Sequence, residues 1–542
     1  MKKLCRKITA ILFAVIFTAV FSSCSESDGT GALVKYAFDQ DPKNLDPQLA
    51  EDIPSMNVIT NMFEGLFKIS ADGTISNGVA ESYTVSDDRL TYVFYLRKDA
   101  FWVGRDDYQK QVTAADFVFA LQRLVNPNTG SPYYDDYFCI KNAEKIHESS
   151  LPASSLGVTA ADDFTLKIQL EYPNADFLRL LTKTSSMPCC RDFFYSTKGK
   201  YGLETSAVIC NGAFYLHQWL YDPYGNDNYL ILRKNQLYSD YLQVSPSSLN
   251  YFINRDSNAS INDFINDELD FIVDNGKTSE LLNKKDVKSN AYEIYSSGII
   301  FNMNKPVFQT EEIRQALAIC IDRGLYQNEL SASAKAAYGL IPAGVTMLNK
   351  SFRELTAEPA LTAYNLTLAQ YLWTSSLTQA EKTELASASI IVPESFLYSQ
   401  NLDSLITQWG QSLELFCAVE VLSDSEYQKR LSSGNFYFAA AEITSAENSP
   451  SPFLESFTAA GDFGTLGYAD EELDALLDSA MKQKTLTEKL LDFQSAEKLI
   501  IDKYYYIPLF YENEYLFFST KITDVIYDPF SKQLDFSATK KF

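Results

Sequence analysis

The sequence predicts an α/β protein whose lobes are interleaved along the chain. Segments typical of strands and of amphipathic helices alternate from residue 33 to the C-terminus, and no low-complexity linker separates them. Hydrophobic residues make up 46% of the 542 residues and charged residues 21%, so the chain can bury a large core. The length corresponds to about three or four domain-sized units.

Local signals in the first part of the chain predict two strands and two helices. A strand is expected over residues 33–38, and a helix over 54–63 has a proline in its first turn. Residues 91–96 are aromatic and β-branched, which is typical of a strand. A second helix is expected from Thr113, where Asp116 completes a capping-box-like start. Its apolar residues recur at helical spacing and should share one buried face: Phe117, Ala120, Leu121 and Leu124.

Signals in the second part of the chain predict three further helices and an aromatic strand. Thr310 begins a helix whose first turn carries two acidic residues, which interact favourably with the helix dipole. Asp470 is expected to cap the next helix, because aspartate is a preferred N-cap residue. The last helix runs from about residue 487 to 503 and leads into a strand over residues 504–511.

The N-terminal segment indicates export. Four basic residues among the first seven precede an uncharged run over residues 8–21, which is short for a membrane span of roughly 20 apolar residues. The pattern is typical of a secretory signal peptide, here residues 1–23. Small residues before Cys24 resemble a bacterial lipobox, so Cys24 is expected to be lipidated; the alternative is a secreted protein with an ordinary Cys24. Residues 24–32 would tether the mature body to a membrane, outside the cytoplasm.

Composition argues against several classes of function. The formal charge of −24 disfavours a nucleic-acid partner, which needs cations to neutralise phosphates. The common hydrolase, metalloprotease and nucleotide-binding signatures are absent, so no catalytic residue, metal or cofactor is expected. His147 lies in a polar stretch and should be at the surface, whereas His217 lies in an alternating strand and should be half-buried.

The cysteine pattern favours thiols over disulfides. Cys5 would leave with the signal peptide and Cys24 would carry lipid. The remaining six are irregularly spaced, and adjacent cysteines pair only with strain. Although disulfides are permitted outside the cytoplasm, we expect six buried free thiols: Cys139, Cys189, Cys190, Cys210, Cys320 and Cys417.

Short motifs follow one another in a characteristic order along the chain. They are Asn44–Pro47 (NLDP), Met62–Leu66 (MFEGL), Gly78–Tyr83 (GVAESY), Leu90–Trp102 (LTYVFYLRKDAFW), Val112–Phe117 (VTAADF), Asn126–Tyr133 (NPNTGSPY), Asn211–Phe214 (NGAF) and Phe301–Phe308 (FNMNKPVF). In this order they resemble the bacterial extracellular solute-binding proteins of family 5, especially the oligopeptide-binding lipoproteins. The resemblance extends from about residue 33 to the C-terminus.

The resemblance implies a two-lobed, periplasmic-binding-protein-like α/β fold of type II, the peptide-binding class, with an extra third subdomain. Lobe I would be discontinuous and would comprise residues 33–65, 173–297 and 507–542. The extra subdomain would comprise residues 66–172, and lobe II residues 298–506.

The resemblance also implies a function without catalysis. The chain would cross between the lobes near residues 297–302 and 504–511, and these crossings would form a hinge. The lobes would close on an oligopeptide or a related small solute, whose backbone groups can pair with strand edges. The closed, monomeric protein would deliver this ligand to the permease of an ABC importer, which is driven by a cytoplasmic ATPase.

Five positions match ligand-contacting positions of the family. Glu51 and Ile53 follow the NLDP motif, Tyr133 ends the SPY segment, Asp274 follows an apolar strand, and Glu447 lies in the second lobe. Four of them also have a simpler interpretation. Glu51 would be a solvated acid before a helix, Ile53 and Tyr133 would be core residues, and Asp274 would be a turn residue.

One stretch departs from the family pattern. Oligopeptide binders of this type usually place an aspartate in the second lobe against the α-ammonium of the peptide, and alignment puts Ala446 there. The same alignment puts Ala440 where an arginine is common. Either the adjacent Glu447 substitutes for the aspartate, or the ligand lacks a free amino terminus.

Three other functions remain compatible with the sequence. The same fold could bind a non-peptide or N-blocked solute, or it could serve a solute-sensing receptor that does not import its ligand. A secreted hydrolase that uses carboxylates is a third alternative, because two suitably spaced acids can support glycosidase chemistry.

Overall fold

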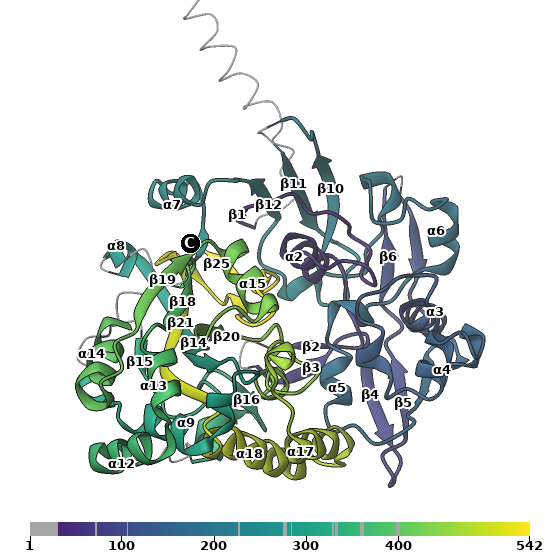
Figure 1. Ribbon diagram of the computed structural model, residues 1–542. Helices are drawn as coiled ribbons and strands as arrows, with labels where there is room; N and C mark the ends of the chain where they lie inside the picture. The colour runs from purple at the N-terminus through teal and green to yellow at the C-terminus, as the bar shows by residue number, and fades with distance from the viewer. Residues whose placement is uncertain are drawn as a thin grey trace, which may run out of the picture.

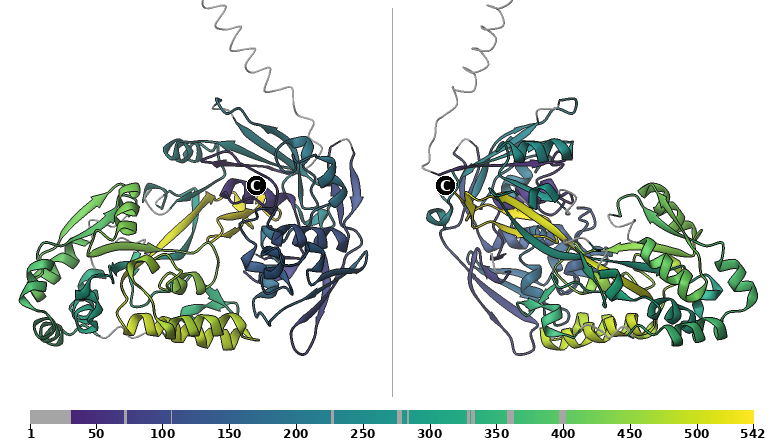
Figure 2. Two further views of the ribbon diagram at one scale, coloured as in Figure 1. Left: turned by 45° about the vertical axis from the view of Figure 1, so that its right-hand side comes forward. Right: turned by 90° about the vertical axis from the view of Figure 1, so that its left-hand side faces the viewer.

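The computed structural model describes residues 31–542 except residues 71–72, 106, 226–227, 275–278, 283, 328–329, 331–333, 358–362 and 397–401. The predicted signal peptide and Cys24 therefore lie outside the described residues. The described chain forms two lobes joined by long strands, as the two views in Figure 2 show. Within these ranges, no helix combines the length and the apolar character needed to cross a membrane.

Each lobe is built around its own apolar core. The first core gathers buried residues between Val34 and Phe271 and, near the C-terminus, between Leu516 and Phe536. The second core gathers residues between Ile294 and Phe510, together with Phe530. Because the chain returns to the first core after building the second, the first lobe is discontinuous in sequence. The predicted two-lobed α/β fold is confirmed.

A four-stranded sheet lies at one end of the first lobe (Figure 1). The strand β1 (Leu33–Phe38) pairs in parallel with β12 (Ser248–Ile253), which confirms the predicted first strand. The sheet continues through β11 (Tyr229–Lys234) to β10 (Phe214–Leu220), with antiparallel pairing.

The helix α2 (Ile53–Met62) holds the C-terminal strand β24 (Gln533–Asp535) through two buried amide side chains. The amides of Asn57 and Asn61 donate to and accept from the backbone of residues 532–536, at 2.7–2.9 Å. Residues four apart on a helix rise about 6 Å, and residues two apart on a strand span nearly the same distance. The two asparagines therefore act as a neighbouring strand would and satisfy backbone groups buried in the first lobe.

A second four-stranded sheet lies in the same lobe. Two of its strands precede the second predicted helix in sequence, and the other two follow it. Its order is β4 (Ala80–Val85), β5 (Thr91–Leu96), β9 (Thr165–Gln169) and β8 (Val158–Asp162). The helix α3 (Ala114–Val125) packs beside it and begins as predicted, because the Asp116 carboxylate accepts from the Thr113 N–H at 2.8 Å. The four residues predicted to share its buried face are fully buried.

The two lobes share a seven-stranded sheet whose longest members are β14 (Val287–Phe301) and β21 (Tyr506–Ser519). These two strands pair antiparallel along most of their length and run from one lobe into the other, as the yellow strand in Figure 2 shows. In the first lobe β21 also pairs with β13 (Phe271–Asp274), and further along with β15 (Ala334–Ala336). On the other side β14 pairs with β20 (Phe438–Ile443), which is followed by β18 (Ser389–Pro393) and β19 (Ala418–Leu422).

Helices cover the second-lobe part of this sheet (Figure 1). They are α9 (Glu311–Ile319), α10 (Arg323–Gln327), α11 (Phe352–Leu355), α12 (Leu366–Ser376), α13 (Gln379–Leu385), α14 (Leu402–Leu413), α15 (Asp424–Ser433), α16 (Ser451–Glu455), α17 (Glu471–Lys482) and α18 (Leu486–Asp502). The three helices predicted in this region correspond to α9, α17 and α18. Asp470 caps α17 as predicted, because its carboxylate accepts from the backbone N–H groups of residues 472 and 473.

Short elements complete the molecule. They are β2 (Phe67–Ile69), β3 (Ile75–Asn77), β6 (Phe101–Val103), β7 (Gln109–Gln111), α4 (Ala143–His147), α5 (Phe177–Leu180), α6 (Arg191–Ser196), α7 (Ser257–Ile265), α8 (Ser279–Leu282), β16 (Thr346–Met347), β17 (Lys350–Ser351), β22 (Ile522–Thr523), β23 (Ile526–Asp528) and β25 (Lys540–Lys541). Most of them join the larger elements at the surface of one lobe.

The predictions for the cysteines and histidines have mixed outcomes. The six cysteines of the described chain are buried free thiols, as expected. The half-buried position expected for His217 is wrong: a bulge after Leu216 interrupts the alternation of β10 and leaves His217 exposed. The surface position expected for His147 is also corrected, because its ring stacks on Tyr134 with centroids 3.6 Å apart and is half-buried.

Candidate ligand-binding site

Three of the predicted site residues lie together at the start of α2. Ile53 is the first residue of this helix and is 44% exposed, and Glu51 just before it is exposed. The hydroxyl of Tyr133 donates to the carbonyl oxygen of Ala50 at 2.5 Å. The sequence places Tyr133 far from this turn, and the fold brings it there.

The turn before α2 is held by short-range hydrogen bonds. The Asp52 carboxylate caps α2 by accepting from the Ser55 N–H at 2.9 Å and from its hydroxyl at 2.8 Å. The Ser55 hydroxyl in turn accepts from the backbone N–H groups of Lys43 and Asn44. These bonds fix the chain on both sides of Glu51, so its side chain projects from an ordered backbone.

The surroundings of Tyr133 are acidic. Burial of its phenol, and to a lesser extent the charges of Glu51, Asp136 and Asp52, raise the pKa of Tyr133 to about 12. Tyr133 therefore stays a neutral hydroxyl in the physiological range. The same charges would attract a cationic group of a ligand.

Glu447, the predicted site residue of the second lobe, meets the first lobe through a lysine. Lys183 forms an ion pair with the Glu447 carboxylate, and its Nζ also donates to Asp136 at 3.0 Å. The side chain of Lys183 is 28% exposed and that of Glu447 is 44% exposed. Burial alone would lower the pKa of Lys183, but the charges of Glu447 and Asp136 outweigh it and raise this pKa above the ordinary lysine value.

The loop that carries Glu447 is ordered by its own side chains. The Ser445 hydroxyl accepts from the Glu447 N–H at 2.9 Å and donates to the Glu447 carbonyl at 2.7 Å. Asn448 binds the backbone and hydroxyl of Thr346. Ala446 is exposed beside Glu447, whereas Ala440 is fully buried in β20, so a longer side chain at 440 would have to displace the second core.

A second ion pair joins the lobes at another place. The Nζ of Lys489, on α18, donates to the Asp176 carboxylate, which precedes α5, at 2.5 Å. Lys489 is 4% exposed. The lobes are thus bridged by two lysines, one beside the predicted site and one at α18.

Asp274 ends β13 and is half-buried. Its partner in the strand register is Tyr515 of β21. It therefore lies on the shared sheet, on a different element from the turn that holds Glu51 and from the loop that holds Glu447.

A family model described as bacterial extracellular solute-binding proteins, family 5 Middle, matches residues 74–465, which is more than half of the chain. The chain belongs to the bacterial extracellular solute-binding proteins, family 5. The resemblance inferred from the motifs is confirmed, and the family is one of binding proteins.

Known relatives of this family 5 chain extend over nearly its whole length. The periplasmic oligopeptide-binding protein OppA of Escherichia coli (strain K12) is 27% identical over 493 residues, which is 86% of this chain and 85% of the relative. The dipeptide-binding protein DppE of Bacillus subtilis (strain 168) is 24% identical over 497 residues, which is 91% and 89% of the two chains. The solved structure of the periplasmic murein tripeptide binding protein MppA, in its unliganded open form, has a TM-score of 0.75 at 22% identity and covers 95% of this chain and 98% of that chain.

Polar groups that sequence reasoning missed lie where the long strands of this family 5 protein run between the lobes. Glu512 of β21 is 2% exposed and accepts from the Ser297 hydroxyl at 2.5 Å. Glu514 lies two residues further along the strand. It forms an ion pair with Lys532 and accepts from the Tyr527 hydroxyl at 2.5 Å. Alternation of the strand puts both acids on the same face. Two acids two residues apart in a strand that is otherwise mostly apolar were the signal that could have marked them.

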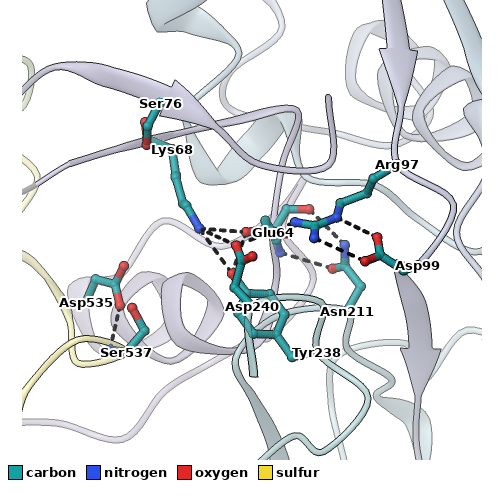
Figure 3. A network of polar contacts seen from close by, with 10 residues as sticks. All are labelled: Glu64, Lys68, Ser76, Arg97, Asp99, Asn211, Tyr238, Asp240, Asp535 and Ser537. Atoms are coloured by element: carbon teal, nitrogen blue, oxygen red, sulfur yellow. Dashed lines mark hydrogen bonds and ion pairs between the residues drawn. The ribbon is translucent and has the colours of Figure 1, made fainter. Parts of the chain in front are cut away.

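The glutamate of the MFEGL motif has a structural role. The Glu64 carboxylate accepts from the Tyr238 hydroxyl at 2.5 Å and from the Lys68 ammonium at 3.0 Å. Asp240 lies beside them and pairs with Lys68 and Arg97 (Figure 3). Next to this network lies a cavity of about 190 Å³ that is lined by Lys68, Asp240, Asp535 and Ser537 among others. None of the five predicted site residues lines this cavity. Among the described residues, no group of three or more His, Cys, Asp or Glu side chains is placed to hold a metal ion.

Proposed function

We propose that this chain is the extracytoplasmic, lipid-anchored substrate-binding subunit of an ABC importer, and that it captures oligopeptides between its two lobes. The observation that carries the proposal is membership of family 5. It is supported by similarity over most of the chain to proteins named for binding oligopeptides and dipeptides. The protein would bind its ligand without changing it and would act as a monomer.

The two cores and the shared sheet support a hinge mechanism. We place lobe I at residues 33–65, 173–297 and 507–542, the extra subdomain at 66–172, and lobe II at 298–506. Strands β14 and β21 would then be the hinge, because they are the long elements that take part in both lobes. A ligand that touches both lobes binds the closed state better than the open state and so shifts the population towards closure.

A peptide suits a cleft with this arrangement. Its backbone offers N–H and C=O groups that strand and loop edges can pair with, whatever its side chains are. We propose that Glu51 and Ile53 contact the ligand from lobe I and Tyr133 from the extra subdomain. Asp274 would contribute from β13, and Glu447 from lobe II. The acidic character of this set favours a ligand with a cationic group, which closure would partly desolvate.

The ligand can be identified directly. The purified protein is denatured, the released small molecules are analysed by mass spectrometry, and binding of short peptides is measured by calorimetry. We expect released peptides and binding of peptides but not of single sugars. Glu51→Gln should weaken binding of the same peptide, whereas Glu81→Gln, at an exposed acid of β4, should not. Binding of another solute with no binding of any peptide would contradict the proposal.

The anchor has a separate test. Cells that produce the protein are labelled with radioactive palmitate, and the protein is isolated from membranes. We expect label on the wild type and none on Cys24→Ser, which should appear in the soluble extracytoplasmic fraction. Equal labelling, or equal membrane association without label, would contradict a lipid on Cys24. Import would be tested by uptake of the identified peptide in cells that lack this protein or carry it.

A further inference from the structure

We propose that Lys183 is a specificity-determining residue: it occupies the position that a ligand ammonium would take against Glu447 and Asp136, so that the protein recognises peptides without using a free amino terminus. The inference rests on the proposed peptide-binding function. It names the class of peptide that the site accepts, which includes peptides whose amino terminus is blocked.

The geometry around Lys183 is that of an occupied ammonium site. Its Nζ lies between two carboxylates, Asp136 at 3.0 Å and Glu447 in direct ion-pair contact. Glu447 comes from lobe II, and Asp136 comes from the proposed extra subdomain, which shares the apolar core of the first lobe. The two carboxylates therefore belong to opposite sides of the space between the lobes. An α-ammonium has the same charge and the same three donors as the lysine ammonium, so the two would compete for the same oxygens.

The competition is unequal because Lys183 is part of the chain. It leads into a turn at residues 184–186 that is held on both sides: the Ser186 hydroxyl donates to the Lys183 carbonyl at 2.8 Å, and the hydroxyls of Ser185 and Tyr137 are 2.9 Å apart. The lysine backbone is thus fixed before any ligand arrives, and its charge is already paired. A peptide ammonium would have to displace a tethered group and leave the Lys183 charge unpaired in a half-buried place, which is costly.

The decisive measurement is a ratio of affinities. One peptide that binds the wild type is prepared with a free amino terminus and with an N-acetyl group, and both dissociation constants are measured by calorimetry. For the wild type we expect the two constants to agree within about threefold. In Lys183→Met the two carboxylates lose their internal cation, so the free peptide should become favoured over the acetylated one by tenfold or more.

Matched variants separate this role from others. Lys489→Met removes the other lysine that bridges the lobes, and it should leave the ratio at the wild-type value. Lys183→Arg keeps the charge and should also keep the ratio. Lys183→Gln is a second neutral variant, with a polar side chain; it should also favour the free peptide by tenfold or more, and it keeps the inference testable if Lys183→Met does not fold.

Three results would overturn the inference. One is a wild type that prefers the free peptide by tenfold or more, with that preference abolished in Glu447→Gln. Another is a ratio in a folded Lys183→Met that equals the wild-type ratio. The third is an equal change in Lys489→Met. In each of these cases peptides still bind, so the proposed function stands. If no peptide binds to any variant or to the wild type, the proposed function falls, and this inference falls with it.

Discussion

The buried carboxyl of Glu512 should make the stability of the protein depend on pH, and Glu512→Gln should remove that dependence. Burial, and to a lesser extent the charge of Glu442, raise the pKa of Glu512 to about 8, although the hydrogen bond from Ser297 opposes the increase. Glutamine has the shape of the protonated acid and an oxygen that can still accept from Ser297. The substitution therefore removes the titration while it preserves the local contact.

The sign and the size of this pH effect follow from the protonation of Glu512 in the folded and the unfolded chain. Below the ordinary glutamate pKa of 4.5, Glu512 is protonated in both the folded and the unfolded chain. Between 4.5 and about 8 the unfolded chain releases this proton and the folded chain retains it, so raising the pH favours unfolding. At about 1.4 kcal/mol per pH unit, this contribution lowers the free energy of unfolding by at most roughly 5 kcal/mol, and it is complete above pH 8.

The assay is urea unfolding followed by circular dichroism at pH 5, 6, 7 and 8. Glu512→Gln should match the wild type near pH 5 and should become the more stable protein as the pH rises, by several kcal/mol at pH 8. Glu514→Gln is the matched control on the same strand. Its carboxylate is paired with Lys532, so its loss should destabilise the protein without any gain at pH 8. Parallel curves for the wild type and Glu512→Gln between pH 5 and pH 8 would refute the reasoning.

Three further substitutions test other contacts. Arg123→Met leaves the buried Asp46 carboxylate without its ion-pair partner and should lower the free energy of unfolding by about 3–5 kcal/mol in urea; a loss below about 1 kcal/mol would contradict a buried pair. Asn61→Ala should speed amide hydrogen exchange at residues 533–536 and cost about 1–3 kcal/mol, and unchanged exchange would count against the helix-to-strand bonds. Tyr133→Phe should cost about 1 kcal/mol of stability and less than threefold in peptide affinity by calorimetry, because the hydroxyl is committed to Ala50. A tenfold loss of affinity would mean that this hydroxyl binds the ligand.

The parts of the fold that the sequence predicted are those specified by neighbouring residues. Strand β5 was predicted with its observed ends, and α3 began where Thr113 and Asp116 form a cap. Both elements depend on side chains that are close to one another in the sequence. The family motifs added the two-lobed arrangement, because their order carries information that no local pattern holds.

The parts that were missed depend on distant partners. Strand β21 runs to Ser519, well beyond the predicted end at residue 511, because β14 and β13 pair with it along its length. The bulge that exposes His217 is set by pairing with β11 and leaves no mark in the alternation of the strand itself. Lys183 and Glu447 are 264 positions apart, so nothing local to either of them indicates the ion pair.

The hydrogen bonds between α2 and β24 have a consequence for folding during translation. The asparagines of α2 are synthesised 473–477 residues before the backbone groups that they bind, at residues 532–536. During translation the first lobe therefore lacks strand β24, and the apolar partners of Leu534 and Phe536 stay unburied until these residues have been made. The second lobe has the strands of its core once β21 has been made, so most of its core can form before the first lobe obtains β24.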